Sequence, residues 1–221
     1  MASLGTFSDH LAGLIPAVGT ADFPARLVST LRALVPVDDA SVIVYPATDL
    51  PVLEYFEVGE DGAGSSLDMF VKGPFLLDPY YLAATRDKRH GVFRLRDLSP
   101  TGFKDSEYYR TWYRNSGFQD ECGFVIPISE HGFVNIALGK TAPRSSFSKR
   151  EKTLLEDVYP VVETLARQHW AQAQGSSSGI NLRAQLHSAL ESFGSSLLTE
   201  RETQVINLVL HGPSTKTVAE K

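Results

Sequence analysis

The chain has 221 residues, 43% of them hydrophobic and 21% charged, which suffices for one domain of ordinary size and a small second one. The net charge of -5 argues against a protein that coats nucleic acid along its whole length. The single cysteine, Cys122, excludes an internal disulfide and fits a small apolar residue in a strand. No signal peptide or stretch of ~20 apolar residues is apparent, so we expect a cytoplasmic protein without membrane contact.

Hydrophobic periodicity predicts an α/β domain, taken in chain order. The expected elements are a helix over 22–35, strands over 40–45 and 51–58, a helix over 78–85, a strand or extended loop over 91–97, a helix over 108–115, strands over 121–128 and 132–138, and a helix over 149–173. Ser148 and Glu151 form a capping box at the start of the last helix. A central antiparallel sheet flanked by helices accounts for this order.

A Gly/Ser-rich segment over 175–179 marks a domain boundary. We therefore predict three parts: an α/β ligand-sensing domain over 1–174, a linker with a short helix over 175–197, and an all-α segment over 198–221.

The last segment has the pattern of two short helices joined by a turn. Thr199 and Glu202 form a capping box, and Gly212 follows the last turn of the first helix as a C-cap. Its apolar face is made by Val205, Ile206, Leu208 and Val209, and Val218-Ala219 stand in the second helix. This pattern resembles the start of the LuxR-type helix-turn-helix domain, and it covers about two helices of that four-helix module.

The resemblance implies a DNA-binding transcription regulator. In the family, the helix that follows Val218-Ala219 leads into the recognition helix of the major groove. The candidate DNA-binding residues are Thr199, Lys216 and Thr217. Residues 199–221 carry balanced charges and lack the recognition helix, so we expect this incomplete module to bind DNA poorly.

The domain in front is similar in element order to GAF and PAS sensors, and one motif is similar to the autoinducer-binding domain of quorum-sensing regulators. Asp78-Pro79 matches that family's Asp-Pro, whose Asp accepts a hydrogen bond from the ligand amide. Phe93 stands where the family has a pocket Trp, but Met69 and Ser65 replace its pocket Tyr and Trp. The resemblance implies a ligand pocket more strongly than it implies an acyl-homoserine lactone. Asp78 is equally interpretable as a helix cap.

An aromatic stretch suggests a different ligand. Tyr108, Tyr109, Trp112 and Tyr113 cover one broad face of the expected helix, and Glu121 follows at the start of an apolar strand. Aromatic faces with a carboxylate suit a cationic or amine ligand. Two other interpretations stay open, because helical aromatic rings usually pack in the core and a Glu at a strand end is often exposed.

The candidate ligand-binding residues are Phe56, Asp78, Tyr81, Phe93, Tyr109, Trp112, Tyr113 and Glu121. No metal-ligand spacing, phosphate-binding loop or nucleophile motif is present, so we expect no cofactor, no metal and no enzymatic activity.

These features together predict a homodimeric, ligand-responsive transcription regulator. A small molecule, with an amine or a lactone as the candidates, would bind the N-terminal domain and control dimer geometry and DNA binding. The alternatives are a dimerisation or protein-interaction domain without a ligand, and an acyl-homoserine-lactone receptor.

Overall fold

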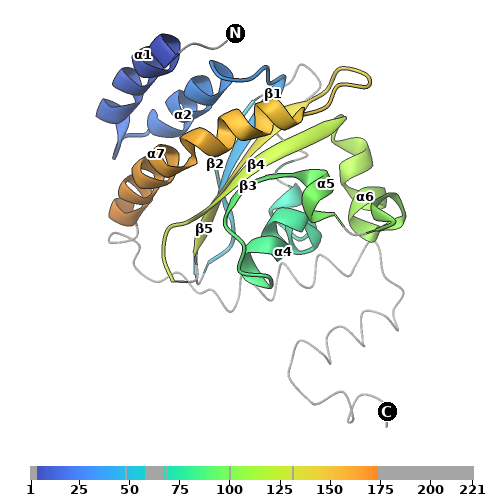
Figure 1. Cartoon of the computed structure of the whole chain (residues 1–221). Helices are drawn as coiled ribbons and strands as arrows, with labels where there is room; N and C mark the ends of the chain where they lie inside the picture. The colour runs from blue at the N-terminus through green and yellow to red at the C-terminus, as the bar shows by residue number, and fades with distance from the viewer. Residues whose placement is uncertain are drawn as a thin grey trace. The chain divides into compact units, whose positions relative to one another are not determined.

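A sheet of five antiparallel strands forms the centre of the protein in the computed structural model, which describes residues 4–47, 49–57, 67, 69–99, 101–130 and 132–173 (Figure 1). In spatial order the strands are β2 (Val52–Phe56), β1 (Asp39–Tyr45), β5 (Phe133–Lys140), β4 (Asp120–Pro127) and β3 (Gly91–Arg94). Every neighbouring pair is antiparallel. The chain divides into two units, Met1–Ile180 and Asn181–Lys221, and the second lies outside the described residues.

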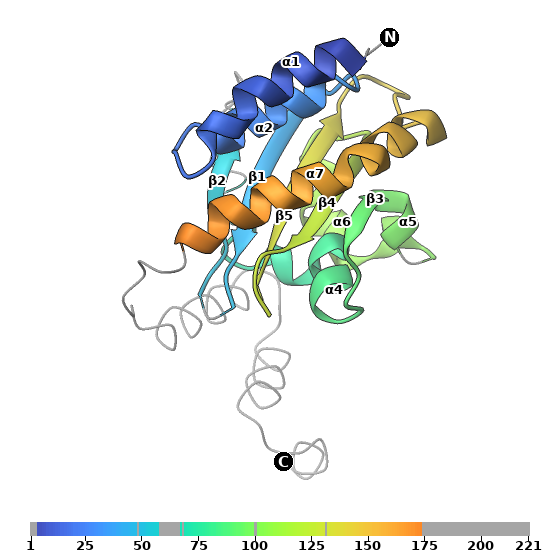
Figure 2. The same cartoon turned by 60° about the vertical axis from the view of Figure 1, so that its left-hand side comes forward.

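Helices cover both faces of this sheet. On the first face lie α1 (Leu4–Leu14), the short turn η1 (Ile15–Ala17), α2 (Phe23–Arg32) and the long α7 (Lys149–Ala173), which runs diagonally across the strands in Figure 2. On the second face lie η2 (Pro74–Leu77), α4 (Pro79–Thr85), α5 (Leu95–Leu98), η3 (Phe103–Asp105), α6 (Glu107–Thr111) and η4 (Tyr113–Asn115). The predicted α/β fold, a central antiparallel sheet flanked by helices, is confirmed.

The first face holds the larger apolar core. Alternate residues of β4, among them Phe124 and Ile126, point toward the side of α7 and are fully buried. Each fully buried Phe or Leu side chain contributes about 1.5–3 kcal/mol of stability. The predicted capping box opens α7, since Ser148 donates its amide to Glu151 and Glu151 donates its own amide to the Ser148 hydroxyl.

The predicted helix over 108–115 is broken in the structure. The helix α6 ends at Thr111, Trp112 adopts an irregular conformation (φ -121°, ψ -68°), and η4 follows. The break allows Tyr113 to pack edge-on against Phe103, with 5.5 Å between ring centroids. Tertiary packing therefore outweighs local helix propensity at this point. The ambiguous segment over 91–97 is a strand, β3, followed directly by α5.

No helix among the described residues is both long and apolar enough to cross a membrane.

Candidate functional site

Polar side chains interrupt the apolar second face of the sheet. Alternation along the strands places Ser41, Glu121 and Asn135 on this face, and all three are buried. The Asn135 side chain is satisfied within the sheet, since its amide donates to the Phe124 carbonyl over 3.2 Å. Buried polar groups in a sheet face need partners. The region of the second face around Ser41 and Glu121 is therefore the candidate site.

Two glycines let aromatic rings approach the strands closely beside these polar groups. A Cβ on Gly123 would lie 2.9 Å from the ring of Tyr80, and a Cβ on Gly139 would collide with the ring of Phe118. Gly139 is also the cross-strand partner of Glu121. The floor of the site is thus backbone, and its walls are aromatic side chains from the loops and helices above it.

Asp78 lies in this wall, at the start of α4. Its Oδ1 accepts the amide N–H of Tyr80 at 2.7 Å, so the predicted N-cap is confirmed. Its Oδ2 accepts the Tyr108 hydroxyl over a longer 3.4 Å. Burial raises the pKa of Asp78 to about 7, although its hydrogen bonds to Tyr80 and Tyr108 act in the opposite direction.

Glu121 is the second buried carboxyl group of the site. It is 6% exposed, which overturns the alternative of an exposed strand end. Burial, and next the charge of Asp78, raise its pKa well above the usual range. Among the described residues, none donates a hydrogen bond or forms an ion pair with its carboxyl group. The Glu121 carboxyl group is therefore expected either to be protonated or to be paired with a bound molecule.

Tyr113 supplies a buried hydroxyl group that interacts electrostatically with the Glu121 carboxyl group. Burial and then the charge of Glu121 raise its pKa. Its hydroxyl oxygen is inaccessible to solvent and has no hydrogen-bond partner among the described residues. An unsatisfied buried polar group costs about 1–3 kcal/mol, so such a group is unusual unless a bound molecule completes it.

The other predicted ligand-binding residues lie on the same side of the sheet but in separate contacts. Tyr81 packs with Tyr45, Phe75 and Phe133, and Trp112 packs on Phe70 with 5.0 Å between centroids. Phe93 lies under the guanidinium of Arg89, and Tyr109 packs on Phe103. Phe56, in the edge strand, is the cross-strand partner of Ser41 and is half-buried. The rings are therefore largely part of a second hydrophobic core, as the packing interpretation predicts.

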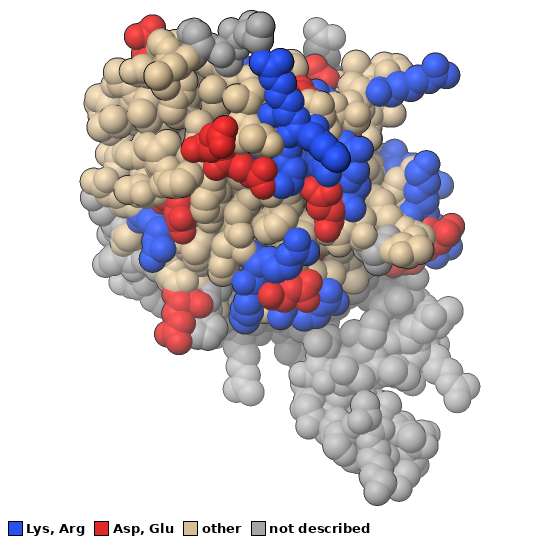
Figure 3. Space-filling model, viewed as in Figure 1, with Lys and Arg blue, Asp and Glu red and all other residues tan. Residues whose placement is uncertain are grey.

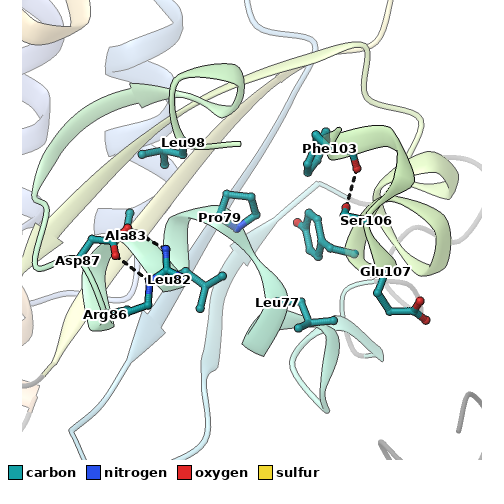
Figure 4. Close-up of a pocket in the computed structure, with 11 residues that line it drawn as sticks. Leu77, Pro79, Leu82, Ala83, Arg86, Asp87, Leu98, Phe103, Ser106 and Glu107 are labelled. Atoms are coloured by element: carbon teal, nitrogen blue, oxygen red, sulfur yellow. Dashed lines mark hydrogen bonds and ion pairs between the residues drawn. The ribbon is translucent and has the colours of Figure 1, made fainter. Parts of the chain in front are cut away.

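A pocket of about 260 Å³ opens between α4, α5 and α6 (Figure 4). Its walls are mainly apolar, with Leu82, Leu98 and Phe103 among them, and the Arg86–Asp87 ion pair lies at its edge. Of the site described above, only the ring of Tyr108 reaches it. None of the eight predicted ligand-binding residues lines this pocket.

The candidate ligand-binding residues left out four residues that the fold brings to the site, namely Ser41, Tyr80, Asn135 and Tyr108, the last of which was recognised only as part of the aromatic stretch. Ser41 and Asn135 are polar residues with apolar neighbours on both sides in their strands, and that pattern was a usable signal. Met69, which replaces the family's pocket Tyr, is 64% exposed and so does not fill that position inside the fold. The predicted DNA-binding residues Thr199, Lys216 and Thr217, like Ser65, lie outside the described residues.

Cys122 is buried on the opposite face, where burial raises the pKa of its thiol to about 12. Within the described ranges, no group of three His, Cys, Asp or Glu side chains is placed to hold a metal ion.

Comparison with known proteins places the chain among transcription regulators. No family model matches it. An HTH-type transcriptional regulator from the exeN 3′ region of Aeromonas salmonicida is 33% identical over 149 residues, covering 64% of this chain and 76% of that protein. The structure of the VqsR LBD domain from Pseudomonas aeruginosa matches with a TM-score of 0.64 and 25% identity, covering 75% of this chain and 96% of that one. Escherichia coli SdiA matches with a TM-score of 0.48 and 12% identity, covering 97% of this chain and 82% of that one.

The first of these relatives matches by sequence, over 76% of its own length, and the second matches by fold. The resemblance predicted from the C-terminal motif and the element order is confirmed: the chain belongs to the LuxR-type helix-turn-helix transcriptional regulators.

Proposed function

We propose that this regulator is controlled by a small molecule that binds against the second face of the sheet, between Asp78 and Glu121. The observation that carries the proposal is the buried Tyr113 hydroxyl, which has no hydrogen-bond partner among the described residues, next to the buried residue Glu121, whose carboxyl group accepts no hydrogen bond from them. A ligand that hydrogen-bonds to both would remove a desolvation cost that the protein's own residues leave uncompensated.

The predicted residues would divide the contacts with such a ligand. Asp78 and Glu121 supply acceptors, Tyr113 a donor, and the rings of Tyr81, Phe93, Tyr109 and Trp112, with Phe56 at the sheet edge, the apolar walls. Tyr108 joins them, because its hydroxyl already contacts Asp78.

The charges of the site favour an amine over a lactone. Two carboxyl groups lie in the same buried region, and within the described residues no Lys or Arg is paired with either. An ammonium group would stabilise the ionised form of both carboxyl groups. It would also be attracted to the ring faces of nearby tyrosines. A neutral lactone amide could donate only one hydrogen bond, to Asp78.

The strand β4 offers a route from this site to the long helix. Glu121 points toward the ligand side, whereas its neighbour Asp120 accepts the amide of Phe147, just before α7, at 2.7 Å. A ligand that displaces the start of β4 would therefore shift the start of α7. The proposed output is a change in homodimer geometry and hence in the spacing of two DNA-binding modules.

A thermal-shift series tests the proposal with phenethylamine and N-butanoyl-homoserine lactone as probes. We expect the amine to raise the Tm of the wild-type chain and to lose affinity in Glu121→Gln, which keeps the shape but removes the charge. Glu130→Gln, an exposed loop position, is the matched control and should bind as the wild type does. At a hundredfold excess over Kd, a ligand stabilises the fold by about 2.7 kcal/mol.

The outcomes separate the alternatives. A shift with the lactone alone, reduced in Asp78→Asn, would favour the lactone receptor. No shift with either probe, together with a dimer in native mass spectrometry, would favour the dimerisation domain. Recovery of unchanged probe after incubation is expected, since we propose binding without turnover.

A further inference from the structure

A larger pocket, of about 630 Å³, lies beside the site around Asp78 and Glu121, between α5, η3, η4 and the start of β4. Its walls are aromatic and come from Phe103, Tyr109, Tyr113 and Phe118. Three cationic side chains, Arg96, Lys104 and Arg114, line it as well, and all three residues are exposed. The volume is in the range of pockets that hold small organic molecules.

The charges that line this pocket are unbalanced. Its one carboxylate, Asp120, is already bound to Arg96 at 3.0 Å. Within the part of the chain that the structure describes, no carboxylate pairs with Lys104 or Arg114. Figure 3 shows the Lys and Arg side chains of this face, with Asp and Glu side chains between them.

We propose that this pocket is a second binding site, for an organic carboxylate with an aromatic body. The aromatic walls would hold the body of the ligand, and Lys104 and Arg114 would hold its carboxylate at the mouth. An Arg guanidinium fits a carboxylate with two parallel hydrogen bonds, whereas an alcohol or an amine offers it no such partner.

This pocket shares Tyr109 and Tyr113 with the site proposed around Asp78 and Glu121, but it differs from that site in its charged side chains. Asp120 and Glu121 are successive residues of β4 and point to opposite sides. Tyr113 separates the two sites, since its ring lines the carboxylate pocket while its hydroxyl is buried away from solvent. One site therefore presents carboxyl groups and the other presents cationic side chains.

The carboxylate site also has a direct connection to the long helix. Arg96 donates to the carbonyl of Phe147 at 2.7 Å as well as to Asp120, and Asp120 accepts the Phe147 amide. A ligand carboxylate that draws Arg96 toward the mouth competes with these bonds. A bound ligand would then weaken the hydrogen bonds to Phe147, the residue that precedes the α7 capping box.

Isothermal titration of the 221-residue chain with three probes of one shape tests the proposal: 3-phenylpropionate, 3-phenylpropan-1-ol and 3-phenylpropylamine. We expect the carboxylate to bind about tenfold more tightly than the alcohol, and the amine to bind most weakly at this site. The double variant Lys104→Gln/Arg114→Gln should lose that preference. Lys72→Gln/Lys149→Gln removes the same charge from exposed positions outside the pocket and should keep it.

Glu121→Gln distinguishes this site from the proposed regulatory site, because it should leave 3-phenylpropionate binding unchanged. Equal affinity for the carboxylate and the alcohol, or an unaltered preference in Lys104→Gln/Arg114→Gln, would overturn the proposal. So would the absence of saturable carboxylate binding in the wild type. The substituted positions in both double variants are exposed, so we expect both variants to keep the Tm of the wild type. A lowered Tm would reveal a folding defect.

Discussion

Asp78 holds the amide of Tyr80 tightly and the hydroxyl of Tyr108 loosely. The bond to Oδ1 is 2.7 Å long and the bond to Oδ2 is 3.4 Å. Oδ1 thus caps α4, and Oδ2 accepts only a long hydrogen bond from Tyr108. The helix-cap and ligand-acceptor interpretations of this residue are therefore compatible, because they use different oxygens.

This buried carboxyl predicts a pH dependence of stability. Burial raises the pKa of Asp78 to about 7, against roughly 3.9 in an unfolded chain. Between these values the native state keeps the proton and the unfolded state loses it. The contribution of Asp78 to the free energy of unfolding is therefore full below about pH 4 and declines as the pH rises to about 7.

Urea unfolding from pH 4 to 7.5 checks this expectation. The free energy of unfolding of the wild type, relative to that of Asp78→Asn, should fall by a few kcal/mol over the interval. Asp22→Asn, at an exposed position that makes no side-chain cap bond, should run parallel to the wild type. Parallel curves for Asp78→Asn would show that the carboxyl is ionised in the native state.

The elements of the fold were predictable because their signals are local. Asp78-Pro79 carries its own capping chemistry, and Ser148 and Glu151 form a box within one turn of helix. The β-branched run of β1 likewise needs no distant residue to favour a strand.

The candidate site was only partly predictable because it depends on contacts between distant segments. Burial of Glu121 follows from the register that pairs it with Gly139. The break at Trp112 follows from the packing of Tyr113 on Phe103. The hydrophobic periodicity of the sequence gives no sign of this contact. The aromatic stripe was therefore recognised, but its division between two pockets was not.

Gly123→Ala should destabilise the domain by about 1–3 kcal/mol. Its Cβ would lie 2.9 Å from the Tyr80 ring and 3.1 Å from the carbonyl oxygen of Ile136, and the backbone oxygen cannot move aside. Gly13→Ala is the matched control, because a Cβ there meets only Arg26 Nη1 at 3.7 Å and Ala favours the helix. Thermal unfolding should give a lower Tm for the first variant and an equal or higher Tm for the second. Equal stability of both variants would show that Tyr80 does not rest on the strand.

His169 should make the contact between α7 and the α1–α2 connection sensitive to acid. Its Nδ1 accepts the amide of Gly19 at 2.9 Å, which requires the neutral ring, and its ring stacks on Phe23. Burial lowers its pKa, so its contribution to stability is present above about pH 6.5 and is lost as the pH falls through the native pKa. Hydrogen exchange of the Gly19 amide should accelerate in acid in the wild type. In His169→Phe, which keeps the stacking but removes the acceptor, exchange should be fast at every pH and show no acid step.

Asp120→Asn should weaken the start of α7 more than the global fold. The Asp120 carboxylate binds the Phe147 amide and Arg96 together, and hydrogen bonds to a charged group contribute about 1.5–3 kcal/mol each. Asn retains one acceptor oxygen but loses the charge, so we expect a loss of about 1–3 kcal/mol in the free energy of unfolding. Amide exchange over 147–152 should rise before exchange elsewhere in α7.

Asp87→Asn is the control for this last variant, because its partner Arg86 is exposed and surface ion pairs contribute little. It should leave both the free energy of unfolding and the exchange over 147–152 unchanged. Uniform acceleration along all of α7 in Asp120→Asn would mean that Asp120 supports the whole helix rather than its start. In that case the proposed route from the ligand sites to α7 would lose its structural basis, since the hydrogen bond between Asp120 and Phe147 would not act on the start of α7 specifically.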